Sequence, residues 1–198
     1  GIAQSASKFA NDLRLLSHLK EVEEPFEEDQ IGSSAMAYKR NPMRCERINA
    51  LARHAITLVL DPAFTAASQW FERTLDDSAN KRIAVPEAYL AIDSILLIQH
   101  NVAAGMVVNP EMIRRRLMEE LPFMATENLM MRSVRAGGDR QELHEKVRRH
   151  AIAAGERVKM QGLENDLLDR IAGDPAFGVS RQELEDELRP ERFVGRAP

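Results

Sequence analysis

The strongest constraint on the fold is a long run of helical periodicity over residues 78–106. Apolar side chains recur there at the spacing of one helix face, at Ile83, Leu90, Ile95, Ile98 and Val102. Pro86 can kink this helix near its start, and Gly105 and Pro110 mark its end. At about 1.5 Å per residue the helix is about 40 Å long. Such a length is typical of a helical bundle and exceeds that of a small compact unit.

The composition indicates an all-α chain. Aromatic residues make up only 5% of the 198 residues, alternating β-branched runs are rare, and Ala, Leu, Glu, Arg and Met are abundant. We place a domain boundary near Val108, so that residues 1–108 form a bundle of long helices and residues 109–198 form a smaller all-helical domain. In the second part, start and stop signals predict helices over 110–121, 126–136, 139–160, 164–172 and 180–188.

Charge, cysteine content and hydropathy exclude several classes of protein. The chain has 27 basic and 31 acidic side chains, a net charge of -4, which disfavours nucleic-acid binding through bulk charge. Its unbroken apolar runs are shorter than the roughly 20 residues of a membrane span, and no leader is visible, so we expect neither membrane insertion nor export. Cys45 is the single cysteine and the five histidines lack metal-ligand spacing, so we expect a cytoplasmic protein without a metal site.

Helical spacing at the N-terminus starts at Ile2 and reaches the first residue without a cap. We therefore expect this sequence to be a cut piece of a longer protein. After a break, the helical pattern resumes over residues 48–60 and ends at Pro62, and a short helix is predicted over 63–71.

A long loop is predicted between the first two helices, over residues 21–42. Six acidic residues crowd around Pro25, and a Gly-Ser-Ser turn at 32–34 precedes Asn41 and Pro42. Ordered loops of this length inside compact proteins are often functional.

A basic cluster follows the loop. Residues 39–53 hold five basic side chains and one acidic side chain, namely Lys39, Arg40, Arg44, Arg47, Arg53 and Glu46. One interpretation is a site for an anion, because the cations follow a turn whose N–H groups and hydroxyls can face a carboxylate. The alternative is a solvated charge pair with the acidic run at 21–29.

The loop carries a resemblance to a known family. Residues 32–42 read Gly-Ser-Ser-Ala-Met-Ala-Tyr-Lys-Arg-Asn-Pro, which is similar to the signature loop of the aspartase/fumarase superfamily, Gly-Ser-Ser-x-Met-Pro-x-Lys-x-Asn-Pro. With residues 69–82 and 121–128, it resembles the C-terminal portion of the adenylosuccinate lyase family. The resemblance implies an all-α long-helix bundle with a signature loop at about 27–42. Ala37 replaces the usual proline, which should free the loop backbone.

The resemblance also implies a reaction in purine biosynthesis. These enzymes release fumarate by β-elimination from adenylosuccinate, giving AMP, and from the succinylated carboxamide ribotide SAICAR, giving AICAR, without a cofactor. Ser33 matches the base that removes a proton from the succinyl group, and Lys39 and Asn41 match residues that hold the carboxylate on which charge develops. For an isolated Gly-Ser-Ser, a turn or helix-cap serine is the more common structure.

Six further positions match substrate-binding residues of the family, namely Ser34, Met36, Arg47, Arg73, Ser78 and Arg82. The last three match residues that bind the nucleotide phosphate, a dianion suited to guanidinium groups and a hydroxyl at the start of a helix. Taken alone, Arg47 reads as an exposed helix arginine and Ser78 as part of a helix cap.

Assembly follows from the same resemblance. The family forms homotetramers with active sites shared between subunits, and its general-acid histidine lies in the N-terminal portion, which this chain lacks. We therefore expect the isolated piece to be inactive. A non-catalytic helical assembly module is the alternative of a different class. Argininosuccinate lyase and fumarase are rivals within the superfamily, and a phosphate site argues against a fumarase.

Overall fold

The computed structural model describes residues 1–26, 36, 38–71 and 75–196. The chain divides into two compact units, which are described separately: unit 1, Gly1–Pro110, and unit 2, Glu111–Pro198. Helices dominate both units, which confirms the predicted all-α fold class.

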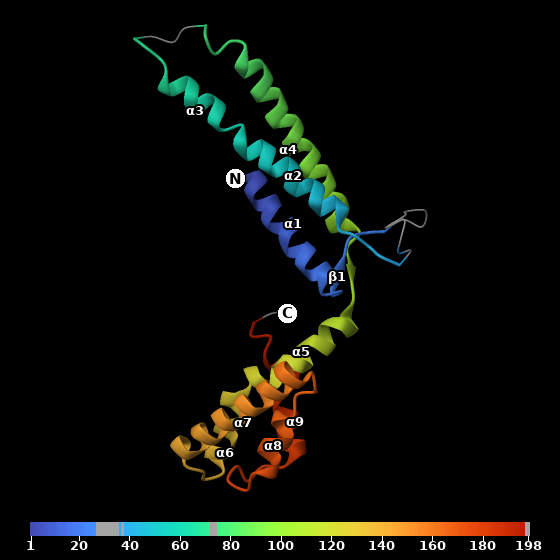
Figure 1. Ribbon diagram of the computed structural model, residues 1–198, viewed down its shortest axis with the longest axis vertical. Helices are drawn as coiled ribbons and strands as arrows, with labels where there is room; N and C mark the ends of the chain where they lie inside the picture. Colours follow the sequence, from blue (N-terminus) through green and yellow to red (C-terminus); the bar gives the residue numbers. More distant parts are fainter. Residues whose placement is uncertain (27–35, 37, 72–74, 197–198) are drawn as a thin grey trace. The chain divides into compact units, whose positions relative to one another are not determined.

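Unit 1 is built from helices α1 (Ile2–His18), α2 (Met43–Thr57), α3 (Leu60–Ala67) and α4 (Asn80–Ala104), shown in Figure 1. Helix α2 packs against both α1 and α4. Small side chains on α1 allow this close approach. The buried core of the unit is formed by Ala3, Ala6, Ala10, Leu13, Val22, Cys45, Ile48, Ala52, Ile95 and Val102.

A short antiparallel ladder joins the start of the predicted loop to the end of α4. Strand β1 (Val22–Glu23) pairs with β2 (Val107–Val108), with Val22 opposite Val108. The Asn109 backbone N–H donates to the Glu21 carbonyl at 2.9 Å. We predicted a loop at residues 22 and 23, because a two-residue strand is too short to produce a period-2 pattern.

The junction between α2 and α3 also differs from the prediction. We predicted one helix through residue 60 that ends at Pro62, but α2 ends at Thr57 and a new helix begins at Leu60. Pro62 lies in the first turn of α3, where a missing backbone N–H removes no intrahelical hydrogen bond.

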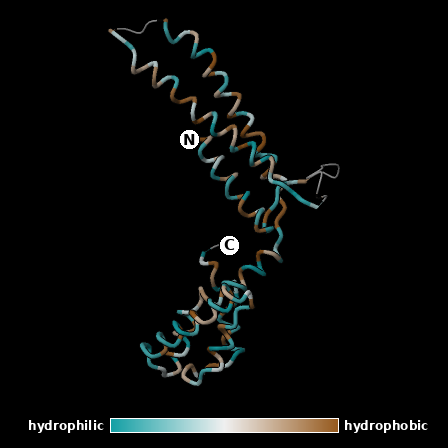
Figure 2. The backbone as a smooth tube through the Cα atoms, viewed as in Figure 1, coloured by the Kyte–Doolittle hydropathy of each residue, from teal (hydrophilic) through white to brown (hydrophobic). Residues whose placement is uncertain are grey.

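Much of the apolar surface of α4 lies outside the core of unit 1. The helix predicted from this apolar spacing is present, but its members differ in burial: Ile95 and Val102 are fully buried, whereas Ile83 and Leu90 are 61% and 67% exposed. Figure 2 shows hydrophobic residues along much of the helix. Among the described residues, α4 is the one helix long and apolar enough by length and composition to cross a membrane, a candidate that the sequence analysis did not find.

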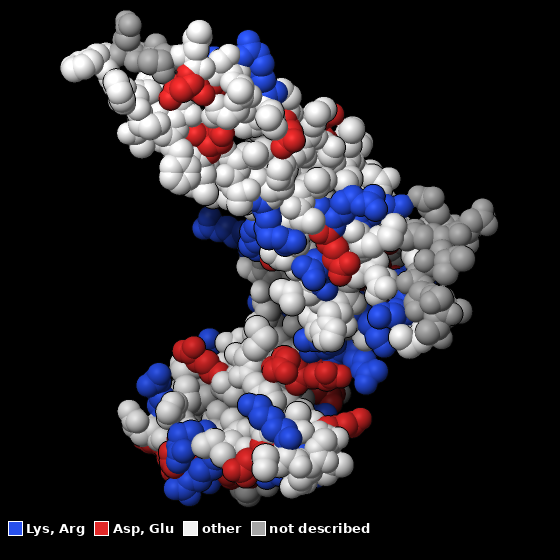
Figure 3. Space-filling view, turned by 45° about the horizontal axis from the view of Figure 1, so that its top comes forward, with Lys and Arg blue, Asp and Glu red and all other residues white. Residues whose placement is uncertain are grey.

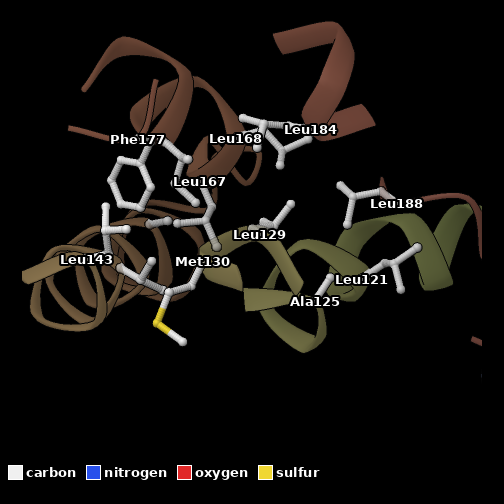
Figure 4. Close-up of a cluster of buried hydrophobic side chains, with 13 residues drawn as sticks. Leu121, Ala125, Leu129, Met130, Leu143, Leu167, Leu168, Phe177, Leu184 and Leu188 are labelled. Carbon is white, nitrogen blue, oxygen red and sulfur yellow. The ribbon is translucent and has the colours of Figure 1, made fainter. Parts of the chain in front are cut away.

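Unit 2 contains α5 (Pro110–Met124), α6 (Thr126–Arg135), α7 (Arg140–Gln161), α8 (Leu167–Gly173), α9 (Arg181–Glu187) and the 3-10 turn η1 (Pro190–Arg192). Its core is a single cluster of buried side chains contributed by α5 to α9 and the segments between them. Figure 4 labels ten members of the cluster: Leu121, Ala125, Leu129, Met130, Leu143, Leu167, Leu168, Phe177, Leu184 and Leu188.

The helix starts in unit 2 confirm the predicted capping signals. Asp139 caps α7 by accepting from the backbone N–H groups of Gln141 and Glu142, both at 2.9 Å. Ser180 and Glu183 form a reciprocal capping box at the start of α9.

Candidate functional site

The candidate site is organised around the two ends of the signature loop. Helix α2 begins directly after Asn41 and Pro42, and Pro42, its N-cap residue, has no side chain that can accept a hydrogen bond. Glu24, which precedes the signature loop, supplies the hydrogen-bond acceptor instead. Its carboxylate accepts from the Arg44 backbone N–H at 3.0 Å and from the Cys45 backbone N–H at 2.6 Å. Glu24 is 7% exposed, so this is a buried cap supplied from a distance.

Further contacts join the same two ends. The Arg40 guanidinium lies 3.3 Å from the Glu23 carboxylate and 4.7 Å from the centre of the Phe26 ring. Arg44 donates to the carbonyl of Pro25. For Arg40, the structure therefore supports pairing with the acidic run, which was the alternative interpretation of the basic cluster.

The described residues of the signature motif form an exposed segment leading into α2. The Lys39 backbone N–H donates to the Met36 carbonyl at 3.0 Å, and the Met43 backbone N–H donates to the Asn41 carbonyl at 2.8 Å. The residues Met36, Lys39 and Asn41 are exposed, as is Arg47 just over one turn into the helix. Exposure allows a ligand to reach this segment from solvent. The predicted positions Ser33, Ser34, Ala37 and Arg73 lie outside the described residues.

The predicted phosphate residues that the structure describes lie together at the start of α4. Arg82 donates to both the hydroxyl and the carbonyl oxygen of Ser78, one turn earlier. The buried carboxylate of Asp77 lies 3.8 Å from the Lys81 ammonium. That ion pair offsets a negative charge that would otherwise oppose binding of a phosphate nearby.

A groove between α3 and α4 adjoins these residues and has a volume of about 690 Å³. Asn80 lines it, and its side-chain amide donates to the Asp61 carboxylate at 2.9 Å and to the Thr65 hydroxyl at 3.2 Å. Its Oδ1 is buried without a hydrogen-bond partner among the described residues. Asn80 is not among the predicted site residues, because an asparagine at the start of a helix resembles an ordinary capping residue.

One chain does not bring the two groups of predicted residues together. Lys39 and Asn41 directly precede α2, and the start of α2 is joined through Glu24 and its neighbour Pro25 to the C-terminal end of α4, whereas Ser78 and Arg82 lie at the N-terminal end of α4. Figure 1 shows the start of α2 beside the end of α4 that leads into β2. A helix of 25 residues is about 38 Å long at about 1.5 Å per residue. The two groups of predicted residues are therefore separated by most of the length of α4.

Cys45 is not suited to nucleophilic chemistry. It is fully buried, and burial together with its contact to Glu24 raises the pKa of its thiol well above the ordinary range. Within the described part of the chain, no group of three or more His, Cys, Asp or Glu residues is placed to hold a metal ion.

Comparisons with known proteins cover the whole chain. Residues 1–57 match the family described as Lyase, and residues 122–198 match the family described as Adenylosuccinate lyase C-terminus. Adenylosuccinate lyases of Saccharomyces cerevisiae, Schistosoma mansoni and Pyrococcus abyssi are 55%, 44% and 34% identical to it, each over 99% of the chain. The chain spans 41%, 41% and 43% of the length of these relatives.

Solved structures share the fold. The 3-carboxy-cis,cis-muconate lactonizing enzyme of Pseudomonas putida gives a TM-score of 0.77 at 23% identity, covering 98% of this chain and 42% of that one. A fumarate lyase of Mesorhizobium gives 0.74, also at 23% identity, covering 98% of this chain and 41% of that one.

The helical fold and the signature motif before α2 define the class as the aspartase/fumarase superfamily of lyases. Within that class, the chain belongs to the adenylosuccinate lyase family and corresponds to the C-terminal portion of its members.

Proposed function

We propose that the full-length protein cleaves adenylosuccinate to AMP and fumarate, and SAICAR to AICAR and fumarate, in the cytoplasm and without a cofactor. The observation that carries this proposal is the signature motif at residues 32–42. It leads into α2 with Lys39 and Asn41 exposed, in a chain whose relatives over 99% of its length are adenylosuccinate lyases.

The proposed chemistry assigns a role to each motif residue. Ser33 removes a proton from the succinyl carbon next to one carboxylate. The bond between the succinyl group and the amino nitrogen of the purine, or the carboxamide nitrogen of SAICAR, then breaks, and the general-acid histidine of the N-terminal portion gives that nitrogen a proton. A serine hydroxyl is a weak acid, so the site must stabilise its alkoxide. Lys39 and Asn41 hold the carboxylate on which negative charge develops, an interaction that is stronger in the transition state than in the ground state.

Substrate binding uses the remaining predicted residues. Ser34 and Met36 within the motif and Arg47 after it contact the substrate, and Arg73, Ser78 and Arg82 hold the nucleotide phosphate. The contact between Arg82 and Ser78 supports this assignment, because a guanidinium and a hydroxyl that lie together can bind neighbouring oxygens of one phosphate.

Assembly into a homotetramer completes the proposal. Two observations support it: the two groups of site residues lie at opposite ends of α4, and this helix exposes a large apolar surface. Its exposed residues include Ile83, Val85, Tyr89, Leu90, Leu96 and Leu97. Exposed apolar area of this extent marks an interaction surface. In the upper part of Figure 3, small groups of acidic and basic side chains are scattered over a mostly uncharged surface. We interpret α4 as an assembly helix and not as a membrane span.

The N-terminal portion of the enzyme is the other proposed partner. It supplies the general-acid histidine, so residues 1–198 alone should be inactive. A lyase assay that follows the absorbance of adenylosuccinate tests the function: the full-length protein should consume it and residues 1–198 should not. A full-length protein without lyase activity would favour the alternative of a non-catalytic assembly module.

Complementation between variants tests whether sites are shared. Lys39→Ala changes the group of site residues near the C-terminal end of α4, and Arg82→Ala changes the group at its N-terminal end. Each variant alone should be weakly active at substrate concentrations below KM, because every one of its sites lacks one of the two side chains. Mixed tetramers, formed by unfolding and refolding the two together, should regain activity, because some of their sites then contain neither change. Refolding each variant by itself is the control. No gain in the mixture would argue that one chain supplies both groups.

A further inference from the structure

We propose that Glu24 is a positioning residue for the reaction, holding Lys39 and Asn41 in place through the first turn of α2. The inference rests on the proposed function, since it assumes that these two side chains act on the substrate. Glu24 precedes the signature motif and is not part of it.

The geometry of the cap connects the two ends of the loop. Glu24 accepts hydrogen bonds from the second and third residues of α2, Arg44 and Cys45, using one carboxylate oxygen for each. A buried carboxylate is costly unless it is compensated, and here two N–H groups and the positive end of the helix dipole compensate it. The start of α2 is therefore fixed to the segment that precedes the loop, 20 residues earlier in the sequence.

The segment that carries Glu24 is itself held firmly. Val22 pairs with Val108 in the ladder, and the Ser17 hydroxyl donates to the Val22 carbonyl at 2.9 Å. Pro25 packs so closely against Gly105 that a Cβ atom at residue 105 would lie 2.7 Å from the Pro25 Cβ. Glu24 thus fixes the start of α2 relative to β1 and to the end of α4.

A purely local cap would stabilise α2 equally well without this connection. Helices α7 and α9 are capped by their own N-cap residues, Asp139 and Ser180. At α2 the N-cap residue is a proline, and the acceptor comes from across the loop. Asn41 is hydrogen bonded through its carbonyl to Met43, so fraying of the first turn would displace Asn41 and Lys39 directly.

Removing the cap should therefore lower the rate of the chemical step. A misplacement of about 1 Å can cost about 100-fold in rate. For Glu24→Ala in the full-length tetramer, we expect kcat to fall about 10- to 100-fold, with KM changed less than about threefold because the phosphate contacts lie at the other end of α4. Glu24→Gln keeps the shape and one acceptor oxygen and should lose less.

Asp139→Ala is the matched control, because it also removes a carboxylate that accepts from two backbone N–H groups at a helix start, but in unit 2. The experiment measures kcat, KM and the thermal midpoint for all three variants, and hydrogen exchange at the Arg44 and Cys45 amides. Both alanine variants should melt earlier, but only Glu24→Ala should lose kcat together with protection of those two amides.

Three results would overturn the proposal: an unchanged kcat in Glu24→Ala, a similar fall in kcat in Asp139→Ala, or a Glu24→Gln variant that does not fold, which would assign Glu24 to stability alone. An inactive wild-type protein is a different result, because it rejects the proposed function itself.

Discussion

At the scale of single residues, Ser33 is the position on which the proposed chemistry depends most. We expect Ser33→Ala in the full-length protein to abolish turnover almost completely while substrate binding remains measurable, because the change removes the base and leaves the phosphate contacts intact. Steady-state assays measure turnover, and calorimetry with adenylosuccinate measures binding. Turnover close to that of the wild type would remove Ser33 from the role of base.

The candidate site was only partly predictable from the sequence. The motif residues stand out because their order and spacing form a pattern, and Ser78 and Arg82 come from a second matching stretch. Glu24 has no such signal: it is one of six acidic residues around Pro25, and a run of acids predicts a solvated surface. Burial distinguishes it from Glu23, and burial depends on the packing of α1, α2 and α4, which is not local in sequence.

At the scale of elements, the close contact between Gly105 and Pro25 makes a testable link between α4 and the loop. We expect Gly105→Ala to destabilise the protein by about 1–3 kcal/mol, the typical cost of forcing extra volume into a packed region, and to lower kcat by displacing Glu24. Chemical denaturation and steady-state kinetics measure the two effects.

Gly155→Ala is a control substitution, for which the expected change in stability has the opposite sign. Gly155 lies inside α7, and apart from its two chain neighbours and the backbone of its own helix, no atom of the residues that the structure describes lies within 4 Å of an added Cβ. Gly155→Ala should therefore stabilise unit 2 by about 0.4–1 kcal/mol through helix propensity and chain entropy. If Gly105→Ala were also stabilising, the contact with Pro25 would not be tight in solution.

The contacts of α9 predict how the stability of unit 2 depends on pH. The Ser180 backbone N–H, then Arg132 and the Ser180 hydroxyl, lower the pKa of Glu183 from 4.5 to about 2. A carboxylate with a depressed pKa in the folded state stabilises that state above its unfolded pKa, so this contribution is lost as the pH falls from about 4.5 to about 2. Glu183→Gln should therefore show a smaller loss of stability than the wild type over this range.

Urea denaturation at several pH values between 6 and 2 checks this prediction. Glu185→Gln, the same charge change on the same helix, controls for the loss of one carboxylate. Equal pH dependence in wild type and Glu183→Gln would contradict the assignment.

Elements whose signals are local were predicted well. The caps of α7 and α9 depend on residues within one turn, and these helices begin where Asp139 and Ser180 indicate. The ladder of β1 and β2 was missed because its pairing joins residues 86 positions apart, Val22 and Val108. The break between α2 and α3 was missed because Pro62 is tolerated in a first turn as well as after a helix end.

At the scale of the whole molecule, the sequence predicts that α4 is apolar, but periodicity does not say which faces are covered by this chain. Ile95 and Val102 face the core of unit 1, whereas Ile83 and Leu90 do not. Both sets have the same apolar spacing in the sequence. A helix that is apolar on several sides is buried by several neighbours, and the spacing does not identify which neighbour covers which side. The exposed set and the separation of Lys39 from Arg82 both fit the proposed assembly, in which further chains surround α4.

This leads to a prediction about assembly. Leu97 is 65% exposed on α4, so Leu97→Glu should leave unit 1 folded but place a charge in an apolar contact between subunits, where an unpaired charge is strongly unfavourable. We expect the full-length variant to dissociate to smaller species and to lose activity in parallel, because in the proposed assembly each site combines residues from several chains. Light scattering coupled to size-exclusion chromatography, with activity measured across the same fractions, tests both.

Met160→Glu is the control, since Met160 is 82% exposed on α7 of unit 2 and should tolerate the charge without a change in mass. A Leu97→Glu protein that keeps the wild-type mass would show that α4 is not an assembly surface. Wild-type protein that floats with lipid vesicles would instead show that α4 is long and apolar because it inserts into a membrane. Dissociation with full activity would show that catalysis does not depend on assembly and that one subunit holds a complete site. The positions of Lys39 and Arg82 near opposite ends of α4 argue against this outcome.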